Sequence, residues 1–525
     1  MSGSTMTMAQ ILGLEMAEPV TPDGPVTCSE LGNARRIVAM HGDDVRHCRA
    51  LPGSGWLVWD GNRWAPDTTG QVVRWVKRLP EILRAEADER ERQARACEGF
   101  VKATEAQAAA DGIDPPDLTQ ERERAVALHR QAKGLREWAP RCEMAGTIRA
   151  ALGLLETESS VPVDLRQLDA DPWQLGTPAG LVDLRTCMGR QAMRADLVTR
   201  QTGAPIDGEA ECPTWLKFLR DTMGGNEEMV GYLQRAVGYS LVGVTSEQVM
   251  FVCHGSGANG KSTFLETLRH VLGDYARNCP ADSFVGRKDG TIPNDLAMLA
   301  GARLVTASET AEGKPLDEAL VKALTGGEPV TARFLNREFF EFQPQFTIWL
   351  ATNHKPRVRG TDHGIWRRIH LVPFAVTVDK SAMDRMLGSK LRAEAAGILR
   401  WAVDGARAWQ EQGLAPPAAV LDATAEYRVE QDVVAEFLEQ CCVLGPDLKA
   451  PASELYSVYA AWCRETGEYQ RASRWLGVQL AARGLEQYKG GKGVRMWRGV
   501  GLGAGRVEQA FGGRQGWQSS GGWEA

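Results

Sequence analysis

The sequence predicts a multidomain α/β protein built around a parallel sheet with helices on its faces. An apolar strand that starts at Phe251 leads into a glycine-rich loop and then into an amphipathic helix, the order that a phosphate-binding P-loop requires. Two more apolar strands follow at 303–309 and 346–351, separated by helical segments, as expected for a sheet of this kind. The length of 525 residues, with 43% hydrophobic and 24% charged residues, is typical of a soluble chain of about two to four domains.

The glycine-rich loop fits the pattern G-x-x-x-x-G-K-S. Its glycines permit positive φ angles that turn N–H groups toward a polyphosphate, and the helix N-terminus adds partial positive charge. Lys261 can then reach the β- and γ-phosphates, while Ser262 can hold Mg²⁺. A plain glycine-rich turn, the alternative, does not account for strand, loop and helix occurring in this order. We therefore expect ATP and Mg²⁺ at a site formed by Gly255, Ser256, Gly257, Ala258, Asn259, Gly260, Lys261, Ser262 and Thr263.

Composition narrows the function classes. A net charge of −6 carries no overall nucleic-acid signature, so any such surface must be local. The 11 cysteines include no C-x-x-C pair, which argues against structural zinc and against a disulfide framework. We expect no signal peptide, because no basic region followed by an apolar run stands at the start, and no membrane span, because no apolar run is long enough; we find no internal repeat. We expect a reduced, cytoplasmic setting in a host cell.

The N-terminal third is expected to be mostly helical. Residues 1–26 are predicted to form a flexible tail, and residues 27–160 a hairpin with charged helices. A short helix is predicted over 31–49. The hairpin runs from Trp56 to Trp64, because Asp-Gly supplies its turn; its tryptophans favour a small aromatic core over base stacking. Long charged helices are predicted over 71–110 and 118–155, with a break at Pro115-Pro116.

Residues 161–242 are predicted to be a collar before the central sheet. The segment 161–200 is β-rich and 215–241 is helical. Asp169 and Asp171 have the spacing of paired metal-binding acids, but the adjacent Pro172 favours an ordinary turn. No second acidic strand and no partner histidine accompany them.

Residues 243–380 carry the candidate chemistry. Glu309 ends one apolar strand and Asn353 follows another, so both are placed to meet Mg²⁺, the γ-phosphate or its water, or else simply face solvent. Arg367 and Arg368 interrupt an apolar segment and suit phosphate geometry; a pair of surface arginines is the alternative. A helix over 320–324 and a hairpin over 330–337 carry Lys322, Arg333 and Arg337, which are either DNA contacts or solubilising charges.

The C-terminal part is predicted in three pieces. Residues 381–445 form helices over 384–412 and onward from Pro416-Pro417 to Cys442. Residues 446–500 read as helix, helix and β-hairpin, a winged-helix-like domain. Its excess of basic residues favours DNA-phosphate contact over a non-binding cap, with Lys489, Lys492 and Arg495 as candidates. Residues 501–525 are predicted to be a disordered glycine-rich tail.

Taken together, these motifs resemble those of superfamily 3 helicases, closest to the poxvirus-type branch of phage and plasmid primase–helicases. The resemblance rests on Asn259 in the loop, the Arg303–Glu309 strand, Lys322-Ala-Leu-Thr-Gly-Gly, Ala351-Thr-Asn353-His-Lys-Pro and Trp366-Arg-Arg-Ile. It implies an AAA+-like core in a ring, usually a hexamer, that moves 3′→5′ on single-stranded DNA. On matching positions, Lys261 and Ser262 are Walker A, Glu309 is Walker B, Asn353 is sensor 1, Arg367 and Arg368 are arginine fingers, and Lys322, Arg333 and Arg337 belong to the pore-facing hairpin. Ser308 precedes Glu309 where many members carry a second acid.

The sequence thus predicts an ATP-dependent replicative DNA helicase of a phage, prophage or plasmid, whose partners are single-stranded and forked DNA, further copies of itself, and a separate primase or host polymerase. We expect no primer synthesis by this chain, because paired metal-binding carboxylates with a partner histidine are missing from it. Two alternatives remain open: an origin-binding initiator whose ATPase switches assembly, and a P-loop small-molecule kinase.

Overall fold

The computed structural model describes residues 27–285, 294–308, 315–333, 339–358, 363–379, 383–466 and 468–503, and the backbone of Val20–Thr21 and Gly24–Pro25. The predicted tails at 1–26 and 501–525 therefore lie almost entirely outside the described residues. So do Glu309, Arg337 and the side chain of Lys492. Among the described helices, none combines the length and the apolarity that a bilayer span needs.

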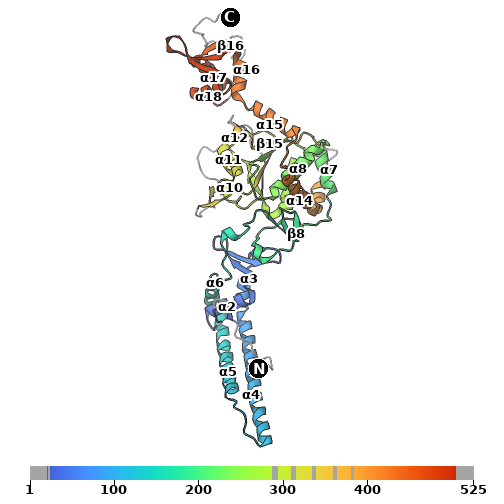
Figure 1. Cartoon of the computed structure of the whole chain (residues 1–525), viewed down its shortest axis with the longest axis vertical. Helices are drawn as coiled ribbons and strands as arrows, with labels where there is room; N and C mark the ends of the chain where they lie inside the picture. Colours follow the sequence, from blue (N-terminus) through green and yellow to red (C-terminus); the bar gives the residue numbers. More distant parts are fainter. Residues whose placement is uncertain are drawn as a thin grey trace, which may run out of the picture.

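The centre of the molecule is a five-stranded parallel sheet covered by helices on both faces (Figure 1), which confirms the mixed α/β prediction. In β9, Phe251 and Cys253 enter one hydrophobic core, while Met250 and Val252 enter the other. Burial on both faces explains why the strands are almost continuously apolar. In sheet order the strands are β10 (Ala276–Pro280), β11 (Leu304–Ser308), β14 (Thr347–Thr352), β9 (Met250–His254) and β15 (Ile369–Pro373).

Helices from distant parts of the chain cover the face that Phe251 enters. Trp215, Phe264 and Trp401 stack or meet edge to face in that core. The glycine Gly238 lets two of these helices touch, because an added Cβ would lie 2.1 Å from the backbone of Gly405 and Ala406. The helices are α7 (Pro213–Thr222), α8 (Glu227–Leu241), α9 (Lys261–Leu272), α13 (Leu387–Ala393) and α14 (Ala395–Gln412).

The N-terminal region folds as a small sheet with a projecting helical arm. The predicted Trp56–Trp64 hairpin forms, and its Trp64 is fully buried, so the tryptophans build a core. The helix expected over 31–49 ends at His41, because a third strand follows it. The elements are α2 (Glu30–His41), β3 (Val45–His47), β4 (Trp56–Trp59) and β5 (Trp64–Pro66).

The arm is an antiparallel helix pair that extends away from the sheet (Figure 1). Leu83, Ala87, Ala132 and Leu135 pack along its seam. Each of the two predicted long helices is interrupted once. Pro80 and Pro140 lie at the two breaks, because proline has no backbone N–H to continue the hydrogen bonding of a helix. The helices are α3 (Gln71–Lys77), α4 (Leu79–Asp111), α5 (Thr119–Trp138) and α6 (Ala145–Leu155).

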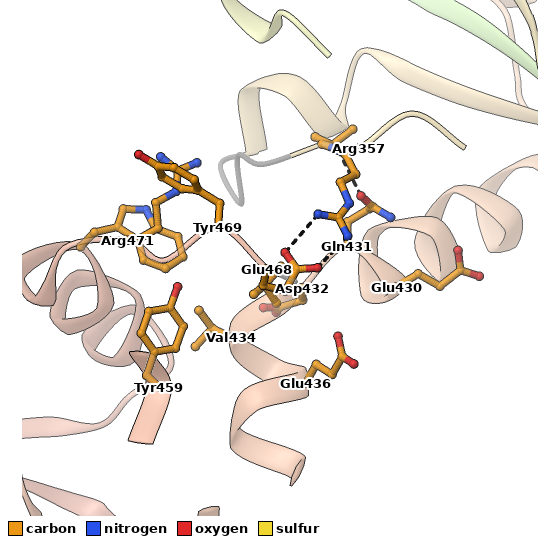
Figure 2. A pocket seen from close by; sticks show the side chains of 13 residues that line it. Arg357, Glu430, Gln431, Asp432, Val434, Glu436, Tyr459, Glu468, Tyr469 and Arg471 are labelled. Atoms are coloured by element: carbon orange, nitrogen blue, oxygen red, sulfur yellow. Dashed lines mark hydrogen bonds and ion pairs between the residues drawn. The ribbon is translucent and has the colours of Figure 1, made fainter. Parts of the chain in front are cut away.

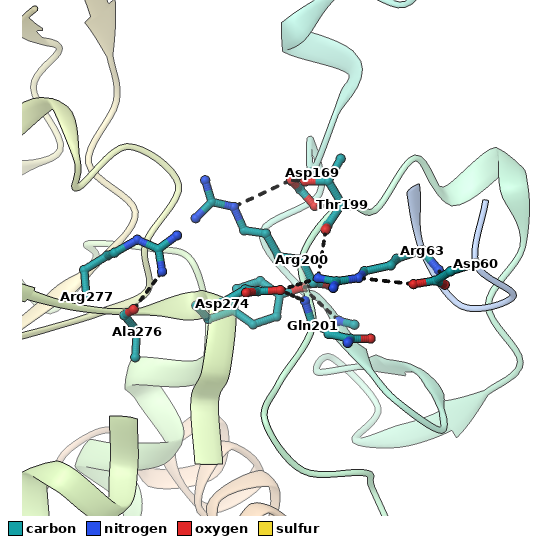
Figure 3. Close-up of polar contacts among 11 residues, drawn as sticks. Asp60, Arg63, Asp169, Thr199, Arg200, Gln201, Asp274, Ala276 and Arg277 are labelled. Atoms are coloured by element: carbon teal, nitrogen blue, oxygen red, sulfur yellow. Dashed lines mark hydrogen bonds and ion pairs between the residues drawn. The ribbon is translucent and has the colours of Figure 1, made fainter. Parts of the chain in front are cut away.

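A β-meander joins this region to the central sheet. Its strands are β6 (Gln174–Thr177), β7 (Gly180–Asp183) and β8 (Met188–Arg190). Figure 3 shows the junction beside it, where Arg63 from the N-terminal hairpin pairs with Asp274 at the base of β10. Arg63 also donates to the carbonyl of Thr199 at 3.3 Å. These contacts connect the arm-bearing region to the central domain.

The C-terminal unit has its own core, which includes Val434 and Trp497. The predicted helices and hairpin form, and β16 adds a strand that the sequence analysis did not predict. Because α16 and β16 share this core, the unit includes residues before the expected boundary at 446. Its elements are α16 (Val433–Cys441), β16 (Cys442–Pro451), α17 (Ala452–Thr466), α18 (Ser473–Ala482), β17 (Glu486–Lys489) and β18 (Arg495–Leu502), with sheet order β16-β18-β17.

A polar latch holds this unit against the central domain (Figure 2). Arg357 donates to both carboxylate oxygens of Glu468, at 2.7 and 3.3 Å. Lys355 pairs with Glu430 at 2.7 Å, near the end of the connecting helix α15 (Ala418–Glu430). The backbone N–H of Val358 donates to the side-chain oxygen of Gln431 at 3.1 Å. The central-domain half of the latch is thus one short segment after β14.

Candidate functional site

The predicted glycine-rich loop joins the end of β9 to the start of α9, and its backbone requires glycine at specific points. Gly257 and Gly260 have φ angles of 105° and 84°, in the region where a side chain is strained. At Gly255 an added Cβ would lie 2.1 Å from the Asn259 side chain and 2.3 Å from the carbonyl of Phe374. The loop is therefore a tight turn that leads directly into the N-terminus of α9.

Lys261 is the central group of the site. Its ammonium donates to the carbonyl of Gly255 at 2.7 Å, to Asn259 Oδ1 at 2.8 Å and to Asn353 Oδ1 at 3.0 Å. The residue is buried, with 6% of its surface exposed, and burial lowers the pKa of the amine. Within the described residues no carboxylate forms an ion pair with it. A buried ammonium held only by neutral oxygens is placed to receive an anion.

Parallel pairing brings the ends of three strands to this loop. Ala351 pairs with Cys253 on one side and with Ser308 on the other, so the chain leaves all three strands at the same sheet edge. Asn353 follows β14 there and contacts Lys261. Glu309 comes directly after Ser308 but lies outside the described residues. The structure therefore brings together the predicted loop and the Asn353 amide, and the position of the predicted acid, Glu309, lies outside the described residues.

An open cleft of about 1180 Å³ lies over this edge. The loop, Ser308 and Asn353 form its floor, and α7 and the segment around α13 form its walls. The walls contribute cationic side chains that the sequence analysis missed: Lys217, Arg385 and Lys390. Lys217 pairs with Asp221 at 2.5 Å and Lys390 with Asp384 at 2.7 Å. In the sequence such mixed charges resemble an ordinary solvated helix face, so only the fold shows that they border the cleft.

The two predicted finger arginines do not reach the cleft of their own chain. Ile369, the first residue of β15, pairs with Met250, the first residue of β9. Arg367 and Arg368 therefore lie where the strands begin, at the opposite end of the strands from the loop. Arg367 is exposed and donates to the side-chain oxygen of Gln248. Arg368 is half-buried and donates to Thr325 Oγ1 at 3.2 Å and to a carbonyl at 2.5 Å. Within one chain, the structure separates this pair from Lys261.

The candidate DNA contacts fall in two places. Lys322 lies on α11 (Glu318–Gly326), and the exposed Arg333 follows β12 (Val330–Ala332), its guanidinium 4.9 Å from the ring centroid of Phe339. The hairpin pairs β12 with β13 (Phe340–Phe342), so its strands are further apart in the chain than predicted and its tip, with Arg337, is outside the described residues.

In the C-terminal unit, Lys489 and Arg495 are exposed and face each other across β17 and β18. Like charges directly opposite each other destabilise a sheet, so this placement favours an anionic partner. The Lys492 side chain lies outside the described residues.

Asp169 and Asp171 have structural partners. Asp169 accepts from the Thr199 N–H at 2.8 Å, and Asp171 forms a bidentate pair with Arg185, with both distances 2.9 Å. The Arg185 side chain lowers the pKa of the Asp171 carboxyl. Among the described residues, no group of three or more His, Cys, Asp or Glu side chains is placed to hold a metal.

Three family models match the chain. They are described as "D5 N terminal like" over residues 34–224, a family of unknown function (DUF5906) over 253–368, and "Poxvirus D5 protein-like" over 429–489. The two regions that match D5 models come before and after the strands of the central sheet in the sequence. The predicted resemblance to the poxvirus-type primase–helicase family is thereby confirmed.

The chain is also similar to viral proteins that are named as helicases or as a primase. The chain is 27% identical over 325 residues to "Putative helicase L207/L206" of Acanthamoeba polyphaga mimivirus, covering 57% of this chain and 34% of the relative. It is 25% identical to "Putative helicase 022R" of Frog virus 3, covering 53% and 30%. It is 28% identical to "Putative primase C962R" of African swine fever virus, covering 43% and 24%. The chain thus spans about a third or less of these relatives' length.

Among solved structures, the apo A form of the NrS-1 C-terminal region aligns with a TM-score of 0.41 and 11% identity, covering 68% of this chain and 90% of that one. Two of these viral relatives are thus named as putative helicases and one as a putative primase. Because one of them is named as a primase, the expected absence of primer synthesis stays a prediction.

Proposed function

We propose that this chain is the ATP-hydrolysing subunit of a replicative DNA helicase. The observation that carries the proposal is the convergence of Lys261 and Asn353 at the edge where β9 and β14 end, beneath an open cleft. A P-loop lysine and a polar amide at the tip of the neighbouring strand are the groups needed to bind a terminal phosphate and orient its attacking water. The names of the viral relatives support DNA as the polymer acted on.

The residues of the site fit ATP with Mg²⁺. The backbone N–H groups of the loop and the N-terminus of α9 would bind the phosphates, and the Lys261 ammonium would exchange its neutral acceptors for phosphate oxygens. Ser262, which is exposed at the cleft, and Glu309 would hold Mg²⁺; the ion supplies charge neutralisation at the phosphates. Asn353 would release Lys261 and turn its amide toward the attacking water.

Completion of the site requires a second copy of the chain in this proposal. Arg367 lies at the far sheet edge from its own loop, so its guanidinium would stabilise the transferring phosphoryl group in a neighbour's cleft. Sites shared in this way suit a ring, with a hexamer and 3′→5′ movement as the family resemblance implies. Lys322, Arg333 and Arg337 would grip the phosphates of single-stranded DNA, giving binding that is sequence-independent and weakens with salt.

The test uses Lys261→Ala and Asn353→Ala, assayed for ATP hydrolysis and for strand displacement on forked DNA. We expect Lys261→Ala to abolish both activities, because the ammonium is the central cation of the site. We expect Asn353→Ala to bind nucleotide and to lose on the order of 10²-fold in kcat, as when one polar group that stabilises the reacting centre is removed. Wild-type-like hydrolysis by Lys261→Ala would refute the proposal.

A second candidate is an origin-binding initiator whose ATPase controls assembly. It is favoured by the opposed cations Lys489 and Arg495 on a helix–helix–hairpin unit, which we interpret as a winged helix that contacts duplex DNA. An initiator would melt a duplex origin yet fail to displace a strand from a fork. Strand displacement that continues after Lys489 and Arg495 are both changed to alanine would favour the helicase.

A further inference from the structure

Helix α15 carries an apolar stripe that the described part of the chain leaves largely exposed. On its inner face Val420 and Tyr427 are each 1% exposed and pack into the hydrophobic cores. On its outer face Leu421 and Val429 are 53% and 72% exposed, with the exposed Ala425 between them. Residues spaced by four lie along one side of a helix. α15 thus has two apolar faces, of which the described residues bury one.

This stripe borders a groove that also contains the predicted arginine finger. The groove has a volume of about 610 Å³, and α15 forms one wall while Trp366, Arg367 and His370 contribute to the other. α15 is fixed there because Thr424 Oγ1 accepts the Leu371 N–H of the edge strand β15 at 3.0 Å. The finger candidate therefore lies beside the exposed apolar surface.

The nucleotide cleft has an apolar rim of its own. Met383 lines the cleft and is 49% exposed. Val376 and Met386, on the same segment between β15 and α13, are 36% and 59% exposed. Flexible methionine side chains adapt to the surface of a partner. The rim and the α15 stripe are on different faces, because the loop and Arg367 lie at opposite edges of one sheet.

We propose that the α15 stripe docks on the cleft rim of a second copy of this chain, so that Arg367 enters the neighbour's nucleotide site. The inference rests on the proposed function and specifies the surface that the subunits use. Each half of the contact is a different face of the molecule, so the association is head to tail rather than a two-fold dimer, and this is the kind of contact that a ring requires. The apolar contact provides the buried surface between the two copies, and the adjacent Arg367 provides a cation for the neighbour's nucleotide site.

The first experiment replaces both exposed apolar residues with glutamate, as Leu421→Glu/Val429→Glu. With nucleotide and forked DNA, the wild type is expected to sediment as an oligomer, the double variant as a monomer. The variant should bind a fluorescent ATP analogue with wild-type affinity, because its own cleft is unchanged, and this binding also confirms that it folds. The matched control is Val126→Glu on α5, where an equally exposed valine (58%) lies on the arm; this variant should assemble normally.

The second experiment mixes two inactive proteins. Lys261→Ala has an intact stripe and a disabled cleft, whereas the glutamate double variant has an intact cleft and a disabled stripe. Mixing them creates one functional contact, so hydrolysis should reappear in the mixture. A mixture that stays inactive would overturn the proposal, as would a double variant that still assembles, or a wild type that remains monomeric. If assembly follows the stripe but the wild type never hydrolyses ATP, the docking surface stands and the helicase proposal fails.

Discussion

Arg367 and Arg368 are neighbours in the chain with different surroundings. Arg367 extends from the surface beside the α15 groove, and Gln248 accepts one of its hydrogen bonds. Arg368 is half-buried and connects Thr325 on α11 with the carbonyl of Gly364. The sequence could not separate their roles, because both fit the same motif. We therefore propose Arg367 as the finger, whereas the contacts of Arg368 hold α11.

This difference predicts distinct phenotypes for the two alanine variants. Arg367→Ala should abolish hydrolysis while leaving nucleotide binding and the melting temperature unchanged. Arg368→Ala should lower the free energy of unfolding by about 1–3 kcal/mol, as expected for hydrogen bonds whose partners are left unsatisfied. Calorimetry and steady-state hydrolysis measured on both variants check this. A stable but inactive Arg368→Ala, together with an active Arg367→Ala, would reverse the assignment.

The sequence predicted those site residues that belong to a continuous sequence motif, and it missed those that only tertiary packing brings to the cleft. Lys261 and Asn353 could be placed because a loop consensus and an apolar strand end are each continuous in the chain, and parallel strands bring such ends to one edge. Lys217 lies on α7, before the sheet strands in sequence, and Arg385 lies in the turn before α13, after them. Nothing in their local pattern distinguishes a cleft wall from a solvated surface, so tertiary packing alone placed them.

At the scale of single elements, the arm carries a titratable contact between α4 and α5. His129 on α5 lies 3.0 Å from a carboxylate oxygen of Glu98 and 3.3 Å from one of Glu91. Hydrogen bonding to Glu98 and Glu91 raises the pKa of His129 above its usual value. Arg136 also faces Glu91, at 3.6 Å. Protonated His129 therefore connects the two helices through charge.

The sign of the pH dependence follows from this raised pKa. His129 stabilises the arm fully below the pKa of the unfolded chain, about 6.5, and this contribution is lost as the pH rises through the higher folded-state pKa. We expect NMR titration to give a His129 pKa above about 6.5. The arm should resist proteolysis less well at about pH 8 than at about pH 6, and His129→Gln should remove that difference. A normal or lowered pKa would contradict the prediction.

Prediction of whole elements succeeded where the residue pattern was strong. Strands β9, β11 and β14 are apolar runs with clear ends, and the Asp-Gly hairpin has a defined turn chemistry. β16 was not predicted, because Gly445 and Pro446 interrupt it and most of its residues are exposed. Its pairing with β18 shifts register between Leu444 and Lys449. Such a strand is defined by its partner rather than by its own residues.

At the scale of the whole molecule, the latch fixes the C-terminal unit to the central domain. Arg357→Ala and Glu468→Ala should each raise the DNA concentration needed to stimulate hydrolysis, because the unit loses its fixed orientation, while hydrolysis without DNA stays at the wild-type rate. The Arg357–Glu468 pair is partly exposed, so the change in unfolding free energy should be only about 1 kcal/mol or less.

The charge-swapped variant Arg357→Glu/Glu468→Arg is the matched test, because it restores an ion pair with the opposite polarity. Recovery of DNA stimulation in the swap, measured against either single change, is the expected result. Arg166→Ala, which removes an exposed ion pair distant from the latch, should have no effect. A swap that behaves like the single variants would show that the pair does not act through orientation.

The segment from Asn353 to Val358 is short enough to transmit force. At one end its amide touches Lys261, and at the other Arg357 and Val358 hold Glu468 and Gln431. About six residues with firm contacts at both ends leave little slack, since an extended chain gains only about 3.3–3.6 Å per residue. In the proposed function, a terminal phosphate would draw the Lys261 ammonium away from Asn353, and a shift of the freed amide would pull on this segment. Each turnover would then change the orientation of the C-terminal unit, because a displacement at Asn353 would be transmitted through Arg357 to Glu468.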